Sequence, residues 1–260
     1  MTHLSLFSGI GGLDLAAERA GFTTVGQAEF ADYPYRVLCK HWPDVPKWKD
    51  VRDVTRDALA EKAITEVTVL SGGFPCQPHS VAGKRLASGD GRDLWGEFAR
   101  IIRDIRPRWV VAENVMGLLS SEHGRFFGRV LGDLAGMGYH AGWGVLKAVD
   151  CGAAHERKRV FIVAHADGVG RHCLETNEQQ KFALFDFKTH EETEPDKIYS
   201  LYADVERVLD HPRSGVLRND DGLSEGMDRL RCLGNAVVPQ QAYPIFAAIA
   251  AYITEQKTGE

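Results

Sequence analysis

Apolar and polar positions alternate along the first two thirds of the chain in a way that predicts parallel β-strands joined by helices. Short apolar runs that end at glycine or polar turns are typical of buried strands, and apolar residues three or four positions apart are typical of helices. The sequence therefore predicts an open α/β sheet. The expected extended segments are 4–7, 23–28, 67–71, 109–112, 139–149 and 160–164, and the expected helices are 13–20, a stretch after residue 32, 93–105 and 125–137.

The pattern changes after about residue 165, where a polar stretch over 175–181 and an acidic run over 191–196 show no sustained period. Apolar residues return from Leu230 onward at helical spacing, which predicts a final helix that packs back on the first part of the chain. The expected organisation is a main domain over 1–164, a small irregular segment over 165–229, and a C-terminal segment over 230–260.

Composition places the chain among ordinary globular proteins, because 44% of its 260 residues are hydrophobic and 26% are charged. The N-terminus lacks a basic stretch followed by a long apolar run, and the most apolar stretch, 244–253, is shorter than the roughly 20 residues that span a bilayer. We therefore expect neither export nor a membrane span. Five cysteines without a CxxC pair indicate no disulfide framework and no metal site, which fits a cytoplasmic protein.

Charge is distributed unevenly. The net charge is −5, so the chain lacks the basic excess of many nucleic-acid-binding proteins. Residues 165–230 carry 8 Lys and Arg against 15 Asp and Glu, a charge of −7, whereas the remainder carries +2. Any nucleic-acid binding must therefore use a local face.

A glycine-rich turn, FSGIGG at 7–12, lies between the first expected strand and the first expected helix. Ligands of doubly wound sheets bind outside the carboxyl ends of the strands, where glycines let a ligand approach the backbone and the helix N-terminus. The turn lacks GxGxxG spacing, which disfavours a dinucleotide, and a purely structural turn is the alternative. Glu29, at the end of the second expected strand, is placed to bind ribose hydroxyls, and a surface acid is the alternative.

A second turn, GGFPCQPHS at 72–80, follows a short apolar strand and places Cys76 between two prolines. Such a stiff turn at the carboxyl end of a strand is where a nucleophile is presented. The alternative is a buried cysteine that packs as a small hydrophobe.

Charged groups end two further segments. Glu113 follows an apolar strand, and its pKa rises if it is buried, so that it holds a proton at neutral pH; a capping or ion-paired glutamate is the alternative. Arg157 and Arg159 share one face of an extended segment and converge on one spot, or else belong to a solvated basic edge.

Taken together and in order, five segments resemble the DNA (cytosine-5) methyltransferase family of the bacterial or phage type. They are FSGIGG at 7–12, GGFPCQPHS at 72–80, ENV at 113–115, HERKR at 155–159 and GNAVVP at 234–239. The resemblance runs from nearly the first residue to about 250, with only the middle of the acidic segment unmatched. It implies a Rossmann-like S-adenosylmethionine-dependent methyltransferase sheet with a small irregular target-recognition segment.

The resemblance implies methyl transfer from S-adenosylmethionine to C5 of a cytosine flipped out of a short duplex DNA sequence. Cys76 corresponds to the cysteine that attacks C6 of the ring, and Glu113 to the glutamate that contacts N3 and the exocyclic amine. Arg157 and Arg159 correspond to arginines that hold the base oxygen and the catalytic loop. Covalent catalysis is needed because C5 of a neutral cytosine is a poor nucleophile.

The resemblance also implies the remaining contacts. Gln77 fills the gap left by the flipped base, while Ser80 and Lys84 belong to a mobile loop that closes over DNA and touches phosphate. The implied cofactor contacts are Phe7, Gly9, Ile10, Gly11, Gly12, Glu29, Phe30, Asp50, Val51, Pro75, Leu94, Asn235 and Ala236, and the implied DNA contacts are Gln77, Ser80, Lys84, Arg213 and Arg218.

The chain departs from the family pattern at two places. His155 stands where the family usually has glutamine, and the segment 165–230 is unusually short and acidic. Because phosphate contacts dominate DNA affinity, the arginines of that segment are expected to cluster on the DNA side, with the acids of 191–196 facing solvent. These arginines are Arg207, Arg213, Arg218 and Arg229.

The expected partner is double-stranded DNA, with a cognate restriction endonuclease acting separately or none, and the expected state is a monomer. The chain begins close to the first motif, which predicts no N-terminal reader domain. Two alternatives stay open: a transfer-RNA cytosine-5 methyltransferase on the same scaffold, and a non-catalytic DNA-binding relative. The intact set Cys76, Glu113, Arg157 and Arg159 argues against the second.

Overall fold

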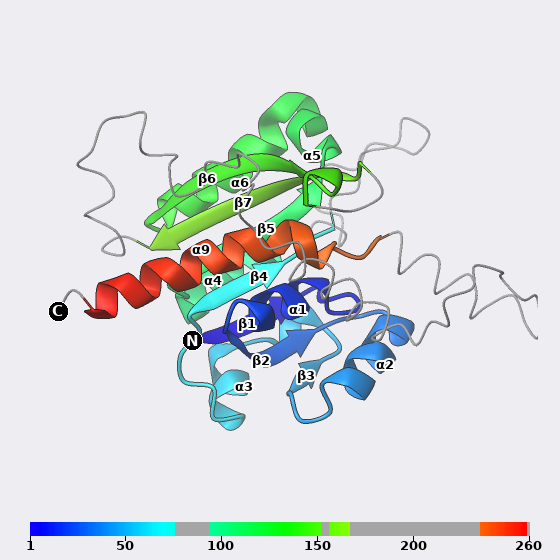
Figure 1. The fold of residues 1–260 in the computed structure, drawn as a ribbon, viewed down its shortest axis with the longest axis vertical. Coiled ribbons are helices and arrows are strands. Elements are labelled where there is room, and N and C mark those ends of the chain that lie inside the picture. Colours follow the sequence, from blue (N-terminus) through cyan, green and yellow to red (C-terminus); the bar gives the residue numbers. More distant parts are fainter. Residues whose placement is uncertain (76–93, 152–155, 167–234, 259–260) are drawn as a thin grey trace, which may run out of the picture.

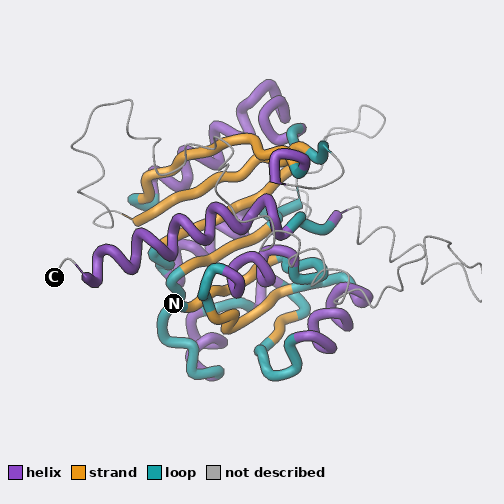
Figure 2. The backbone as a smooth tube through the Cα atoms, in the orientation of Figure 1, coloured by secondary structure: helices purple, strands orange, loops and turns teal. Residues whose placement is uncertain are grey.

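One β-sheet forms the centre of the molecule, with helices on both of its faces (Figure 1; Figure 2). The computed structural model describes residues 1–75, 94–151, 156–166 and 235–258. Across these ranges the sheet has seven strands in the order β3-β2-β1-β4-β5-β7-β6. The strands are β1 (Thr2–Leu6), β2 (Thr23–Ala28), β3 (Lys47–Trp48), β4 (Val69–Gly72), β5 (Trp109–Val115), β6 (Tyr139–Lys147) and β7 (Lys158–Ala166).

The first five strands are parallel to one another, so their carboxyl ends meet along one side of the sheet. Leu6 of β1 pairs with both Ala28 of β2 and Gly72 of β4, and Gly72 pairs with Ala112 of β5. These four paired residues, near the carboxyl ends of β1, β2, β4 and β5, therefore lie at nearly the same height in the sheet. We call this side the carboxyl edge and the opposite side the amino edge.

The helices lie in two layers. Helices α1 and α9 cover one face of the sheet, and α4 and α6 contribute to the core on the other face (Figure 1). The helices are α1 (Gly12–Arg19), α2 (Asp32–His41), α3 (Arg56–Glu61), α4 (Trp95–Ile105), α5 (Gly117–Ser120), α6 (Arg125–Gly136) and α9 (Pro239–Thr258), with 3-10 turns η1 (Val51–Asp53), η2 (Ser121–Gly124) and η3 (Val149–Cys151).

The last two strands differ from the expected parallel arrangement, because β7 is antiparallel to both β5 and β6. The connection over 148–157 is shorter than the dozen or more residues that a parallel crossover requires, so β6 and β7 form a hairpin. The start of β7 consequently lies at the carboxyl edge, where Arg159 pairs in register with Val115 of β5.

Several predicted bounds shift by a few residues. The first strand ends at Leu6, because Phe7 adopts a left-handed conformation with φ of 51°. The final strand continues to Ala166, past the expected boundary at 164. The short elements β3 and α3 were not expected, because their apolar patterns cover too few residues to show a period.

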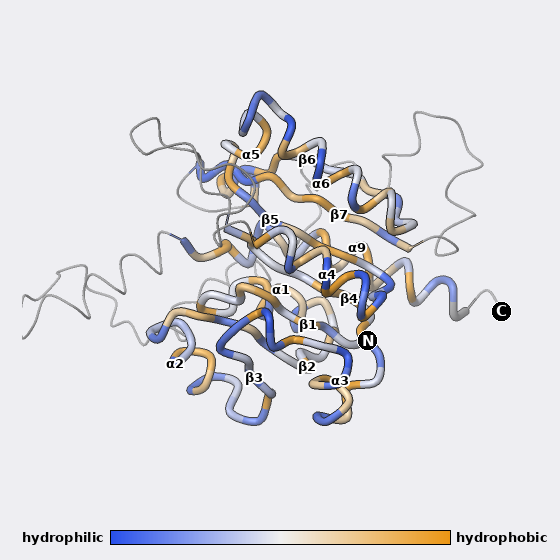
Figure 3. Tube along the Cα trace, turned by 180° about the vertical axis from the view of Figure 1, so that it is seen from behind, coloured by the Kyte–Doolittle hydropathy of each residue, from blue (hydrophilic) through white to orange (hydrophobic). Residues whose placement is uncertain are grey.

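Each face of the sheet buries its own hydrophobic core, and hydrophobic residues follow strands β5 and β7 (Figure 3). On the α4 side, the Trp95 ring lies 5.2 Å from the Phe74 ring and 5.6 Å from the Phe98 ring, measured between centroids. On the other side α9 packs against α1, as the apolar spacing of its sequence predicts. No helix in the described ranges is both long and apolar enough to cross a membrane.

The chain ends lie on the amino edge. The N-terminus precedes β1 directly, and Tyr252 near the end of α9 lies 5.6 Å from Trp109 at the start of β5, measured between ring centroids. Figure 1 shows N and C on the same side of the sheet.

A buried histidine links three strands under α9. The Nε2 atom of His3 lies 2.7 Å from Ser71 Oγ, its Nδ1 atom lies 3.4 Å from Thr24 Oγ1, and its ring packs edge-on against Phe246. Burial lowers the pKa of His3 to about 3. Because the unfolded histidine has a higher pKa, this group weakens the fold as pH falls from about 6.5 toward 3.

A buried carboxyl group gives the opposite dependence. Asp14, fully buried in the first turn of α1, accepts hydrogen bonds from Ser5 Oγ at 3.1 Å and Gln27 Nε2 at 3.0 Å. Burial raises the pKa of Asp14 from 3.8 to about 7. The folded state therefore binds more protons than the unfolded state between these values, so stability falls as pH rises through this window and levels off above it.

Asp14→Asn is expected to remove this alkaline loss of stability, which amounts to at most about 4 kcal/mol for such a difference in pKa. The measurement is the free energy of urea unfolding at pH 5 and pH 8. The exposed Asp57→Asn serves as the control and should retain the wild-type pH dependence. An unchanged pH dependence in Asp14→Asn would contradict the prediction.

Candidate active site

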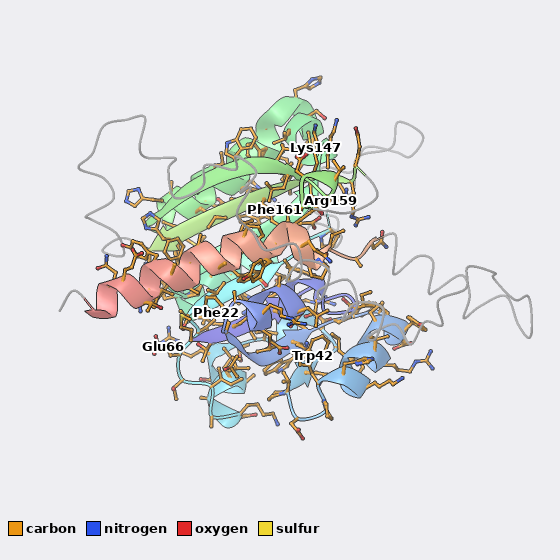
Figure 4. All side chains as sticks on the ribbon, in the orientation of Figure 1. Phe22, Trp42, Glu66, Lys147, Arg159 and Phe161 are labelled. Atoms are coloured by element: carbon orange, nitrogen blue, oxygen red, sulfur yellow. The ribbon has the colours of Figure 1, made fainter. Side chains whose placement is uncertain are left out.

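The carboxyl edge brings together segments that are far apart in the sequence. The ends of β1, β2, β4 and β5 meet there with the start of β7 and with the residues that precede α9. Figure 4 labels Lys147 and Arg159 near this edge, and Phe22 and Glu66 toward the amino edge. Most of the predicted site residues that fall in described ranges lie in or beside these segments, whereas Asp50 and Val51 follow β3 and Leu94 precedes α4.

The glycine turn connects β1 to α1 through three residues with positive φ. Phe7, Gly9 and Gly11 have φ of 51°, 56° and 91°, and Gly11 is the N-cap of α1. The Gly11 amide donates to Ser8 O at 2.9 Å. Ile10 is buried, while a Cβ on Gly9 would meet nothing within 4 Å. The turn thus presents open backbone at Gly9.

Glu29 at the end of β2 holds this turn. Its Oε2 accepts from the Gly9 amide at 2.8 Å, and its Oε1 accepts from the Ala31 amide at 2.8 Å. Burial raises the pKa of this carboxyl group, and these hydrogen bonds oppose the rise. Each carboxylate oxygen retains acceptor capacity, so Glu29 can also receive a ligand hydroxyl. Phe30 beside it is 75% exposed.

The other side of the turn rests on α2. The Trp42 ring packs so closely on Gly11 that an added Cβ would lie 2.4 Å from a ring carbon, and the Trp42 Nε1 donates to Glu18 Oε1 at 2.7 Å. Gly12 is equally confined, because a Cβ there would lie 2.3 Å from Val237 O. Trp42 was not predicted as a site residue, since it lies outside the glycine motif.

Gly11→Ala is expected to destabilise the fold by about 2–5 kcal/mol, because the left-handed backbone and the clash with Trp42 add. Gly9→Ala is the matched control: it has a left-handed backbone but free space, so its cost is about 1–2 kcal/mol. Urea unfolding of both variants measures the difference. Equal destabilisation would show that the Trp42 contact does not constrain the turn.

Two of the expected cofactor contacts, Asp50 and Val51, lie shortly after β3. Asp50 caps η1 by accepting from the Arg52 amide at 2.9 Å, and it forms an ion pair with the Arg52 guanidinium at 2.6 Å. This hydrogen bonding lowers the pKa of Asp50. Val51 is buried in the core, and Leu94 packs against that core from the residue before α4.

The strand before the cysteine turn is anchored up to Phe74. Asn114 Nδ2 donates to Phe74 O at 2.9 Å, and a Cβ on Gly72 would lie 2.7 Å from Leu6 O. Pro75 follows as an exposed residue. Cys76, Gln77, Ser80 and Lys84 lie outside the described residues.

Glu113 is the buried acid of the carboxyl edge. Its side chain is 9% exposed, and its Oε1 lies 2.9 Å from Nε of Arg159. Its Oε2 lies against Gly73, where an added Cβ would come within 3.1 Å. Burial raises the pKa of Glu113 to about 7, although Arg159 and Arg157 oppose the rise. Glu113 is therefore buried, as the expected role requires, and it is also paired with Arg159, as the alternative of an ion-paired glutamate has it.

The charges of both arginines act on Glu113, as their expected convergence requires, but the two side chains contact different groups. Arg159 in β7 faces Glu113, whereas Arg157 precedes β7 and its Nη2 donates to Ala236 O at 2.6 Å. Because Arg157 lies before the strand, the alternation that predicted a shared face does not apply to it. Burial and the charge of Arg159 lower the pKa of Arg157.

The residues before α9 cover the glycine turn. Ala236 is half-buried and Asn235 is exposed, and the Val237 carbonyl contacts Gly12. Gln241, fully buried in the first turn of α9, donates through Nε2 to Arg157 O at 2.8 Å and Leu146 O at 3.0 Å. Sequence reasoning missed Gln241, because its apolar neighbours indicate only a packed helix.

The remaining predicted residues fall on parts of the chain that the structure does not describe. The segment 167–234 contains the four arginines expected to face DNA, Arg207, Arg213, Arg218 and Arg229, and His155 lies in the gap at 152–155. Within the described ranges, no three His, Cys, Asp or Glu side chains form a group that could hold a metal ion.

A protein-family model described as C-5 cytosine-specific DNA methylase matches residues 1–216. The Type II methyltransferase M.HgiCII of Herpetosiphon aurantiacus is 30% identical over 246 residues, which cover 94% of this chain and 51% of the relative. The Type II methyltransferase M.Eco47II of Escherichia coli is 38% identical over 175 residues, covering 65% of this chain and 41% of the relative. The chain spans about half the length of these curated relatives.

A solved structure shares the fold over nearly the whole chain. The mutant DNMT2 of Spodoptera frugiperda superposes with a TM-score of 0.65 at 15% identity, covering 95% of this chain and 99% of that protein. At this identity the likeness concerns the fold alone, a Rossmann-like α/β sheet.

Proposed function

Because this chain belongs to the C-5 cytosine-specific DNA methylase family, we propose that it transfers a methyl group from S-adenosylmethionine to C5 of a cytosine in a short duplex DNA sequence. The relatives are named Type II methyltransferases, which supports DNA as the substrate and a restriction-modification role. The nucleophile in this proposal is Cys76, and the base is flipped out of the duplex to reach it.

The observation that carries the proposal is the buried pair Glu113 and Arg159 beside Gly73. A carboxyl group with a pKa of about 7 is protonated in a large fraction of molecules at neutral pH, so it can donate a hydrogen bond to a ring nitrogen. Arg159, 2.9 Å away, supplies a donor for the base oxygen and keeps the carboxyl group oriented. Gly73, which lies beside Glu113, precedes Cys76 by three residues in the sequence.

The glycine turn and its neighbours fit S-adenosylmethionine. Gly9 leaves open space over its backbone, and Glu29 beside it offers a carboxylate to ribose hydroxyls and to a cation. Phe30 and Asp50 each lie two residues after the end of an adjoining strand, β2 and β3 respectively. When bound, the cofactor supplies an electrophilic methyl group on a sulfonium. The other proposed contacts are Phe7, Ile10, Gly11, Gly12, Val51, Pro75, Leu94, Asn235 and Ala236.

In the proposed mechanism the Cys76 thiolate forms a bond to C6 of the cytosine, and the displaced electron pair moves toward C5 and N3. Glu113 stabilises this charge by giving its proton to N3, while Arg159 holds the base oxygen. C5 is then nucleophilic and takes the methyl group, and the demethylated cofactor is the leaving group. Loss of the C5 proton to solvent, departure of the thiolate and return of the N3 proton to Glu113 restore the aromatic ring and the free enzyme.

The proposal extends to the DNA-binding residues. Gln77, Ser80, Lys84, Arg213 and Arg218 are proposed to contact DNA, the first by filling the space of the flipped base and the others at phosphates or bases. We further propose a monomeric cytoplasmic enzyme, with a cognate restriction endonuclease, where one exists, acting separately.

Methyl transfer from labelled S-adenosylmethionine to unmethylated genomic DNA tests the proposal. Label recovered in 5-methylcytosine is the expected result, and bisulfite sequencing of the product then maps the target sequence. Label on transfer RNA and none on DNA would show that the chain is the alternative, a transfer-RNA cytosine-5 methyltransferase. Binding of the cofactor with no transfer to either nucleic acid would favour a non-catalytic relative.

A further inference from the structure

The described part of the carboxyl edge holds two half-sites that come from different segments. The cofactor half consists of the glycine turn and residues 235–238, and the base half consists of Glu113 and Arg159. Methyl transfer requires a fixed distance between the two bound groups, because a misplacement of about 1 Å can cost about 100-fold in rate. A contact that joins the halves would therefore matter to both.

One set of contacts joins them in both directions. Arg157, two residues before Arg159 of the base half, donates from its side chain to Ala236 O at 2.6 Å. From α9, the Gln241 side chain donates to the carbonyl of the same Arg157 at 2.8 Å and to Leu146 O at 3.0 Å. The residues between them are held against the glycine turn, since Val237 O contacts Gly12.

The burial of Gln241 makes this link stiff. Its side chain is fully buried, and both donors of its amide nitrogen are used by carbonyls at the ends of β6 and β7. Hydrogen bonds in such a site are expensive to break, because the carbonyls would be left without water. An apolar residue would serve a merely packed helix equally well at this position.

We infer that Gln241 is a positioning residue. Through its contact with Arg157 it fixes the position of the cofactor half relative to the base half. The inference rests on the proposed function, because it assigns S-adenosylmethionine to the cofactor half. Gln241 touches neither the cofactor nor the base in this arrangement. It acts by holding residues 235–238 on Gly12.

Binding of S-adenosylmethionine to the full chain without DNA, measured by titration calorimetry, tests the inference. Gln241→Met keeps the length of the side chain but removes both donors, and its affinity is expected to fall about tenfold. Ile253→Val is the matched control, because it removes buried volume from the far end of α9 and should leave the affinity within twofold. Thermal unfolding of both variants reports the loss of stability separately.

If Gln241→Met does not fold, a second pair of variants at Arg157 tests the same inference. Arg157→Ala removes the contact to Ala236 and should weaken cofactor binding about tenfold, whereas Arg157→Lys retains a donor and should weaken it less. Where all variants fold, the Gln241→Met and Arg157→Ala double variant should be little weaker than either one, because both changes release the same residues.

The outcomes separate this inference from the proposed function. If Gln241→Met lowers the melting temperature as Ile253→Val does and leaves the affinity unchanged, the role of Gln241 is only structural and the inference is wrong. Full additivity of the two variants would also overturn it. A wild-type chain that binds no S-adenosylmethionine would reject the proposed function, and the inference with it.

Discussion

Cys76→Ala is expected to lower methyl transfer at least ~10⁴-fold, because removal of a covalent nucleophile leaves only binding and electrostatic stabilisation. In the sequence it follows Pro75, and the segment before Pro75 is anchored by the hydrogen bond from Asn114 to Phe74 O and by the burial of Phe74. Transfer of labelled methyl groups measures the loss, and covalent capture on DNA containing 5-fluorocytosine reports bond formation separately. The variant should fail in both assays and still bind the cofactor.

Two other cysteines provide the control for this experiment. Cys39 is exposed, and burial raises the pKa of the half-buried Cys151 thiol to about 11, so that thiol stays neutral. Cys39→Ala and Cys151→Ala should retain transfer and capture within a factor of a few. If covalent capture persists in Cys76→Ala and disappears in Cys151→Ala, the nucleophile is Cys151 and the proposed role of Cys76 is wrong.

Glu113→Gln is expected to reduce kcat about 10³-fold, which is within the range for loss of a positioned general acid. The glutamine keeps the shape of the side chain and a partner for Arg159, but it has no proton to transfer to N3. Single-turnover kinetics on DNA with excess enzyme measure the chemical step. Cofactor affinity without DNA should stay within twofold of wild type.

The pH profile gives a second signature of Glu113. Because burial raises its pKa to about 7, the protonated form is lost as pH rises through 7, and kcat/KM of the wild-type enzyme should fall above this value. Glu113→Gln should lack this alkaline fall. Glu97→Gln, which breaks a surface pair with Arg100, should keep both the wild-type rate and the wild-type profile. An alkaline fall that survives in Glu113→Gln would assign it to another group.

Much of the fold could be predicted because strands and helices carry strong periodic patterns. The run 109–112 was predicted as a buried strand, which the structure extends to Val115, and Trp95, Phe98 and Ile102 mark one face of α4. The direction of β7 could not be predicted from its own apolar run, since periodicity does not record orientation. Only the length of the connection before it disfavours a crossover.

The site could be predicted in part. Motif spacing brought Glu113, Arg159, Glu29 and the glycine turn to one edge, and the structure places them there. The contact of Arg157 depends on the carbonyl of Ala236, and the role of Gln241 depends on two further backbone carbonyls. Every residue has a backbone carbonyl, so the sequence does not show which carbonyls accept a hydrogen bond from a side chain. Side chains with such a role therefore cannot be identified from the sequence.

Placement of both chain ends on the amino edge has a practical consequence for studying the molecule on surfaces. A biotin or a fluorophore attached at Met1, or beyond α9, would project from the side of the sheet opposite Glu113. Molecules tethered in this way to a coverslip or a sensor chip would present the carboxyl edge to the solution. Single-molecule binding to long nucleic acids could therefore be recorded without the support blocking the approach.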